Sequence, residues 1–450
     1  MLARNSSYTS LIPSWCKRGG TLGVLLVLVC VLTWPGVSLA QLDICGCAGN
    51  PNSLGAFDTR DATTYPPGTT SGNQFLTIPL PEDGILIFDS FTVVPRPSDS
   101  SNFLQVFFAP NEANTPVTLL VSGDVTTALR GNIVVSGSNG TSGTSGVNGI
   151  GGLGGPGGFR GGDGAYQLVN FANVGGAGFG PGGGAPDTPS PLARGGGGTF
   201  FGTPELLPMI GGSGGGGGAS TSNAISCSAG GGGGGAGAIL IAANGTITNN
   251  GTMQAIGGER GFPGAGCASQ GGSGSGGAIR LVADTITGSG SLQAFGGFLG
   301  GPGAIRLEAF TNTMSATGTN PVATCAPAPG PVSNPLTPKV AITAVNGQTQ
   351  SLANGQLLSE LPQGGFGAVD VILSVPGVAT IDLATSGVPT GTTVRVTAKP
   401  RVGGAPVSVD TPVDPGNCDA EGNCVAAAEF ILAAGAFVIE AQATFQTPSP

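Results

Sequence analysis

Short segments in which apolar residues alternate with small polar residues recur along this chain, and they predict β-strands rather than helices. Three of these segments share an Ala-Ile opening and end in turns of Asn, Gly or Ser: Ala238 to Gly258, Ala278 to Gly297 and Ala304 to Gly318. Related candidates lie upstream, at Val117 to Gly140, Ile85 to Val94 and Phe103 to Phe108. Because one such unit cannot bury its apolar row alone, the repeats predict a parallel β-solenoid, or β-helix, of stacked strands.

Glycine occupies every third position from Gly137 to Gly164. This period matches a left-handed extended helix with three residues per turn, which forms no hydrogen bonds within itself. Collagen has the same glycine period, but Pro156 is the only proline in this tract; a flexible linker is the second alternative. We expect polyglycine-II-like loops that bond to each other beside the solenoid, because that arrangement satisfies their backbone groups.

The composition changes near residue 319. Thr319 to Pro338 is rich in proline and is predicted to be a linker. Residues 339–446 then contain about seven strand candidates, the number and spacing of an immunoglobulin-like β-sandwich. The Cys, Trp and Cys of the immunoglobulin core are missing here, so the expected likeness concerns architecture alone.

The first forty residues predict a secretory signal peptide. Lys17 and Arg18 precede an apolar run from Thr21 to Thr33, and Ser38-Leu39-Ala40 places small residues where a signal peptidase cuts. The alternative is a membrane anchor, but this run is short for about 30 Å of hydrocarbon. We therefore expect cleavage after Ala40, a Cys-containing segment over 41–72, the solenoid over 73–318, and no integral membrane segment after cleavage. The exported product would be extracellular or on the cell surface, with the periplasm as another possibility.

An exported chain meets an oxidising compartment, so its cysteines are expected to form disulfides. The Ala-Ile pair at positions 238 and 239 recurs 40 residues later, and Cys227 recurs at the same interval as Cys267. Equivalent positions of adjacent solenoid coils lie about 4.8 Å apart, within disulfide reach. Cys227 is therefore predicted to bond to Cys267. Cys418 and Cys424 bracket a short loop and are predicted to bond to each other, and the pairing stays open for three others: Cys45, Cys47 and Cys325.

Charge and composition exclude several functions. Without the signal peptide the chain has 12 basic and 24 acidic side chains, and this negative net charge argues against binding to nucleic-acid phosphates. The chain also has no histidine to act as a general base or metal ligand. No cofactor and no metal site are predicted. Asp414, Asp419 and Glu421 near the Cys418 loop offer oxygen ligands for calcium, but a solvated acidic turn is the favoured interpretation.

No catalytic residue is predicted, although some parallel β-helices degrade polysaccharides. Such sites need paired carboxylates on one face, and the acids of the predicted solenoid are widely spaced: Asp124, Asp163, Glu259, Asp284 and Glu308. Arg280 and Arg306 follow Ala-Ile in two repeats and are expected to form an exposed, solvated row. The sequence favours a protein that is not an enzyme.

Pro116 to Thr126 (PVTLLVSGDVT), Gly131 to Gly140 (GNIVVSGSNG) and the glycine-rich repeats that follow resemble the glycine-rich, predicted β-helical proteins exported by bacteria. The resemblance covers roughly residues 75–310, and the tail resembles immunoglobulin-like modules of bacterial surface proteins. These resemblances imply display outside the cytoplasm. They bring no catalytic motif.

The favoured function is a structural or adhesive surface protein whose partners would be polysaccharide, other cell-surface components or further copies of itself. A carbohydrate- or ice-binding protein is the alternative, and it requires a regular ladder of threonine or asparagine. The sequence offers fragments of such a ladder at four positions: Thr246, Thr248, Thr285 and Thr287. A polysaccharide-degrading β-helix enzyme is the third hypothesis.

Overall fold

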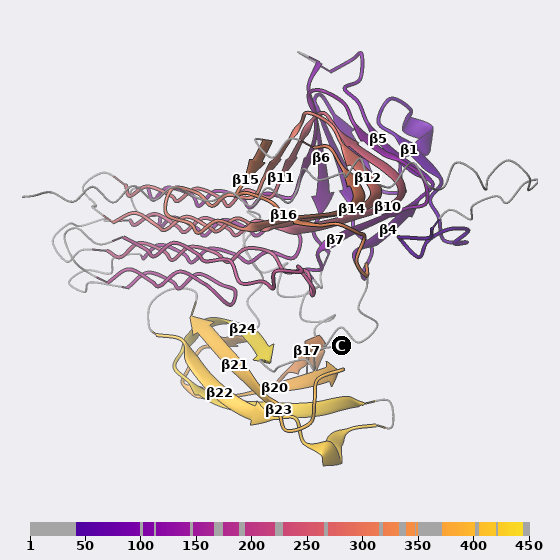
Figure 1. The fold of residues 1–450 in the computed structure, drawn as a ribbon. Coiled ribbons are helices and arrows are strands. Elements are labelled where there is room, and N and C mark those ends of the chain that lie inside the picture. Colours follow the sequence, from indigo (N-terminus) through magenta and orange to yellow (C-terminus); the bar gives the residue numbers. More distant parts are fainter. Residues whose placement is uncertain are drawn as a thin grey trace, which may run out of the picture.

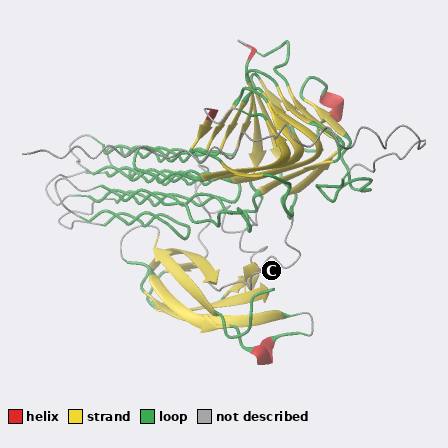
Figure 2. Cartoon of the chain, in the orientation of Figure 1, coloured by secondary structure: helices red, strands yellow, loops and turns green. Residues whose placement is uncertain are grey.

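The computed structural model describes residues 42–99, 102–111, 114–144, 147–165, 174–188, 194–220, 228–264, 269–314, 318–332, 339–346, 348–349, 371–400, 405–419 and 422–443. Within these ranges the chain is all-β, apart from the short 3-10 helices η2 (Ala62–Thr64) and η5 (Pro415–Asn417). Figure 2 shows the strands in two groups, with long irregular segments extending from the first group. No helix in the described part has the length and apolar character needed to cross a membrane.

The first group consists of two sheets whose described strand pairs are parallel, except that β2 and β3 are antiparallel (Figure 1). One sheet has the order β1-β5-β8-β10-β12-β14-β16; β7 also pairs with β10, and β4 pairs with β7. Its strands are β1 (Ala56–Asp58), β4 (Ile85–Phe88), β5 (Ser90–Val93), β7 (Val117–Val121), β8 (Val125–Thr127), β10 (Ala238–Asn249), β12 (Ala278–Thr287), β14 (Ala304–Asn312) and β16 (Thr324–Ala326). We call this sheet the first sheet.

The second sheet has the order β15-β13-β11-β9-β6-β3-β2. Its strands are β2 (Thr70–Gly72), β3 (Phe75–Pro79), β6 (Leu104–Ala109), β9 (Gly131–Val134), β11 (Thr252–Gln254), β13 (Ser291–Gln293) and β15 (Thr319–Asn320). Successive circuits of the chain pass through the first sheet and return through the second, for example from β10 to β11 and from β12 to β13.

Alternation of apolar residues places one row of side chains between the two sheets. Ile239, Ile279 and Ile305 are in register on neighbouring strands, and each is almost completely buried. Met253 and Leu292 of the second sheet belong to the same buried cluster. Since burying an aliphatic side chain of this size contributes about 1.5–3 kcal/mol, the stacked rows hold the two sheets together.

The predicted period of three is visible in the backbone hydrogen bonds of the glycine-rich tracts. We call the described parts of residues 136–237, 256–277 and 295–303 the glycine bundle; its tracts lie side by side in Figure 1. Consecutive residues donate to three different tracts: Gly231 to Thr141, Gly232 to Gly162 and Gly233 to Gly272. Gly234 then donates to Ser138, three residues from Thr141, so the pattern repeats every three residues.

The second group of strands, residues 339–443, forms two four-stranded sheets in which the described pairs are antiparallel. The orders are β18-β17-β20-β23 and β19-β24-β21-β22, made of β17 (Lys339–Val345), β18 (Gln348–Thr349), β19 (Val371–Leu373), β20 (Gly377–Ser386), β21 (Thr393–Pro400), β22 (Val407–Pro412), β23 (Asn423–Leu432) and β24 (Gly435–Ala443). Both sheets contribute to one buried cluster, with Ile381 and Phe430 from the first and Val396 from the second.

The parallel sheets extend beyond the limits expected for the solenoid. β1 and β2 lie within the expected N-terminal segment, and β15 and β16 lie within the expected linker. Proline in the segment suggested a linker, but Cys325 pairs in register with Leu307 of β14, and the strand ends before Pro327. A short edge strand tolerates proline close by, because proline lacks only the hydrogen-bond donor at its own position.

Candidate functional site

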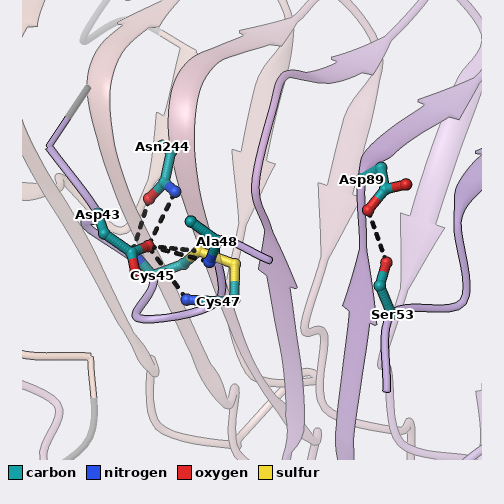
Figure 3. The surroundings of a disulfide bond; sticks show 7 residues. All are labelled: Asp43, Cys45, Cys47, Ala48, Ser53, Asp89 and Asn244. Atoms are coloured by element: carbon teal, nitrogen blue, oxygen red, sulfur yellow. Dashed lines mark hydrogen bonds between the residues drawn. A yellow bond between two sulfur atoms is a disulfide. The ribbon is translucent and has the colours of Figure 1, made fainter. Parts of the chain in front are cut away.

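The segment that precedes β1 is fastened to the outer face of the first sheet by a small polar cluster, which we call the clasp: Asp43, Cys45, Cys47 and Asn244 (Figure 3). Cys45 and Cys47 form a disulfide and are buried against Leu240, Ala242 and Val282. These side chains point away from the core between the sheets, so the clasp covers an apolar surface that would otherwise face water.

Asn244 on β10 connects the two segments. Its Oδ1 accepts a hydrogen bond from the Cys45 backbone N–H at 2.9 Å, and its Nδ2 donates to Asp43 Oδ1 at 2.9 Å. The same carboxylate oxygen accepts from the backbone N–H groups of Cys47 and Ala48, at 3.1 and 3.3 Å. The hydrogen bond from Asn244, assisted by these backbone groups, holds the pKa of Asp43 below its usual value of 3.8.

A second attachment of the same segment lies beside the clasp. Ser53 Oγ donates to Asp89 Oδ1 at 2.7 Å (Figure 3). The Leu54 backbone N–H donates to the Ile87 carbonyl at 2.8 Å. The chain before β1 is therefore held at two places, on the outer face of the first sheet at β10 and at the sheet's β4 edge.

The clasp brings together ligand types that bind metals. One ligand atom each from Asp43, Cys45 and Cys47 lies within 4.8 Å of the others. Cysteine binds metals as the thiolate, and the disulfide engages both sulfur atoms. In this oxidised form the arrangement supports a structural role: a covalent ring that presents its backbone N–H groups to one carboxylate.

Loss of the Asn244 side chain should loosen the clasp. We expect Asn244→Ala to lower the free energy of unfolding by about 1–3 kcal/mol, because it removes one partner from a buried backbone donor and another from a carboxylate. Urea denaturation would measure the change, and limited proteolysis would show faster cleavage before residue 56. Asn250→Ala is the matched control, since its Oδ1 accepts from Ser289 at an exposed site; equal effects of both substitutions would contradict the clasp.

The expectation for Arg280 and Arg306 was wrong. Arg280 is only 1% exposed, and Arg306 is largely covered. Both lie beside Glu308: Arg280 Nε donates to Glu308 Oε1 at 2.9 Å and Arg306 Nε donates to the same oxygen at 2.6 Å. The Gly330 backbone N–H donates to Glu308 Oε2 at 2.7 Å, and Pro331 accepts from Arg280 at 3.0 Å. A segment distant in sequence thus covers a face that strand alternation assigns to solvent.

Two rows of threonine cross the outer face of the first sheet, and they extend the fragments seen in the sequence. One row follows the strand register through Thr92, Thr126, Thr248 and Thr287, and Thr313 Oγ1 donates to Thr287 Oγ1 at 2.8 Å. The second row contains Thr246, Thr285 and Thr311. Successive hydroxyls of a row are separated by the strand spacing of about 4.8 Å.

The cysteines expected to bond have different outcomes. The structure joins Cys418 to Cys424 by a disulfide. Cys227 and Cys267 lie outside the described residues. The sequence analysis did not assign a partner to Cys45 or Cys47, and the structure joins them to each other. The sequence did contain a signal for this site, an aspartate two residues before a Cys-Gly-Cys triplet.

The role of Asn244 was not predicted because the Asn-Gly pair indicated a turn, whereas β10 continues through both residues with a register shift.

The acidic turn beside Cys418 uses its carboxylates locally. Asp414 Oδ1 accepts from the Gly416 N–H at 2.8 Å, and both oxygens of Asp419 accept hydrogen bonds from Asn423. Glu421 lies outside the described residues. These bonds are those of a self-capped turn.

The described fold and site define an all-β protein with a large parallel two-sheet region. Comparison of the chain with family models, curated proteins and solved structures found no match.

Proposed function

We propose that this chain is a non-enzymatic, exported structural or adhesive surface protein. In this proposal the two parallel sheets form a β-solenoid, the glycine bundle consists of polyglycine-II helices, and residues 339–443 form an immunoglobulin-like sandwich. The likeness to bacterial exported glycine-rich proteins belongs to the same proposal. The observation that carries it is the hydrogen-bonding of the bundle, where Gly231, Gly232 and Gly233 each bond to a different tract. Tracts bonded on three sides form a fixed scaffold.

The use of the acidic side chains favours a scaffold over an enzyme. Asp163 accepts hydrogen bonds from Arg160 and from the Gly151 backbone inside the bundle. Asp124 Oδ1 accepts from the Thr246 N–H at 2.7 Å, and Glu308 is surrounded by two arginines. A general acid or base must exchange protons with substrate, and carboxylates held by structural donors are poorly suited to that work.

Display on the surface gives a direct test. Intact cells that make the protein should lose it on treatment with a protease that does not enter cells, while a cytoplasmic marker protein survives. The purified protein should release no reducing sugar from polysaccharides with which it is incubated. Protection of the protein until the cells are lysed, or steady release of sugar, would contradict the proposal.

A carbohydrate- or ice-binding protein is the second candidate, and the threonine rows favour it. Thr126, Thr248 and Thr287 are partly exposed, whereas the residues between the rows, such as Ile247 and Ile286, point into the core. The outer face of the first sheet thus carries hydroxyls in a two-dimensional repeat, spaced by about 4.8 Å across strands and by two residues along them. Inhibition of ice-crystal growth by the purified protein would favour this candidate over the first.

A further inference from the structure

Two exposed phenylalanines on the glycine bundle share one arginine, and we call the three residues the aromatic platform: Arg260, Phe262 and Phe298. Phe262 is 53% exposed and Phe298 is 65% exposed. The Arg260 guanidinium carbon lies 4.2 Å from the centre of the Phe298 ring and 5.5 Å from the centre of the Phe262 ring. Exposed aromatic groups of this size on a polar scaffold mark binding surfaces.

Hydrogen bonds to neighbouring tracts of the glycine bundle hold the platform in place. Arg260 Nε donates to Gln270 Oε1 at 2.7 Å, and the Gln270 carbonyl accepts from the backbone of Gly195 in another tract. Glu259 Oε2 accepts from the backbone N–H of Phe298 at 3.2 Å, which ties the two tracts together. Because the rings rest on a hydrogen-bonded scaffold, a ligand would lose little affinity to the ordering of side chains.

One donor of the platform has no acceptor. Arg260 Nη1 is buried and has no hydrogen-bond partner among the described residues. Buried donors are nearly always satisfied by protein, water or ligand, so Arg260 keeps donor capacity that no described protein group uses. A small rotation of the guanidinium would make this capacity available to a ligand hydroxyl.

We propose that the aromatic platform binds a neutral polysaccharide, with the apolar faces of its sugar rings stacked on Phe262 and Phe298. The proposal rests on the surface-protein function and names a ligand class for it. Sugar rings combine flat C–H faces with hydroxyl edges, and the platform offers two ring surfaces beside an arginine and Gln270. A neutral polymer is favoured over an anionic one because the chain without its signal peptide has 12 basic and 24 acidic side chains, and because the Glu259 carboxylate is held at the platform by the Phe298 backbone.

The test measures binding of the purified mature chain to cellulose and chitin, with alginate as the anionic comparison. We expect Phe262→Ala and Phe298→Ala each to weaken binding about tenfold, and Phe298→Tyr to retain it. Phe310→Ala is the matched control, because Phe310 is 55% exposed on β14, outside the platform. Circular dichroism would establish that every variant is folded.

Three outcomes would overturn the inference. The first is undiminished binding by a variant that carries both Phe262→Ala and Phe298→Ala. The second is tighter binding of alginate than of the neutral polymers. The third is a wild-type dimer that dissociates in Phe298→Ala while no glycan binds. If protease treatment of intact cells removes the protein but the platform variants bind like wild type, this inference alone fails. If the protein is protected inside cells, the proposed function fails instead.

Discussion

Replacing Gly234 with alanine is expected to lower the free energy of unfolding by about 3 kcal/mol. A Cβ atom at this position would overlap the backbone carbonyl of Leu153 in the neighbouring tract. The tracts must then separate, and the hydrogen bonds that Gly234 donates to Ser138 and accepts from Gly258 would be lost with them. Chemical denaturation followed by circular dichroism would measure the loss.

Gly301 provides the control for steric contact. It lies in the same bundle, but the nearest atoms to an added Cβ are 3.5 Å away, an ordinary van der Waals distance. Gly301→Ala should therefore leave the denaturation midpoint close to that of the wild type. Equal destabilisation by both substitutions would show that general glycine flexibility, and not close packing, determines the effect.

Glu308→Gln should destabilise the protein by about 3–5 kcal/mol, because it leaves Arg280 charged and buried without a compensating carboxylate. Replacing both partners, as Arg280→Met with Glu308→Leu, should recover most of this loss, since apolar side chains suit a buried position. Asp410→Asn is the control: the Arg395–Asp410 pair is exposed, and its loss should leave the midpoint unchanged. A double variant as unstable as the single one would contradict this account.

The same carboxylate predicts a pH dependence. Burial opposes ionisation of Glu308, but the hydrogen bonds from Arg280 and Arg306 outweigh it and hold the pKa below the usual value of 4.5. A depressed pKa stabilises the folded state above pH 4.5, and this contribution is lost as the pH falls through the lower folded value. The difference in midpoint between wild type and Glu308→Gln should therefore shrink when denaturation is repeated at decreasing pH.

Much of the strand arrangement could be predicted from the sequence, because it depends on local repetition. The Ala-Ile openings at Ala238, Ala278 and Ala304 indicated stacked strands, and the structure pairs these residues in that register. The glycine period of three indicated tracts that bond to their neighbours, as Gly231 to Gly233 do. Both features could be recognised because residues at a regular spacing in the sequence make the same kind of contact in each repeat.

The clasp and the Glu308 cluster could not be predicted, because their partners are distant in sequence. Asn244 meets Asp43 across about 200 residues, and Arg280 is covered by the segment that contains Gly330 and Pro331. Alternation along a strand reports which side a residue faces but not whether another segment lies over that side. The Asn-Gly pair at Asn244 was misinterpreted for a related reason. Its local preference is to turn, but β10 pairs with β12 immediately before it at Ala243 and immediately after it at Thr246, so the strand continues past the pair with a register shift.

The composition of the glycine bundle has a thermal consequence. Unfolding of an ordinary domain raises the heat capacity by about 12–15 cal/mol/K per residue, because apolar surface becomes hydrated, whereas hydration of polar groups lowers it. Gly230 to Gly235 are consecutive glycines and release peptide groups almost alone. Melting of the bundle should therefore have a small heat-capacity change and a flat stability curve, so that cooling weakens the aliphatic core between the sheets before it weakens the bundle.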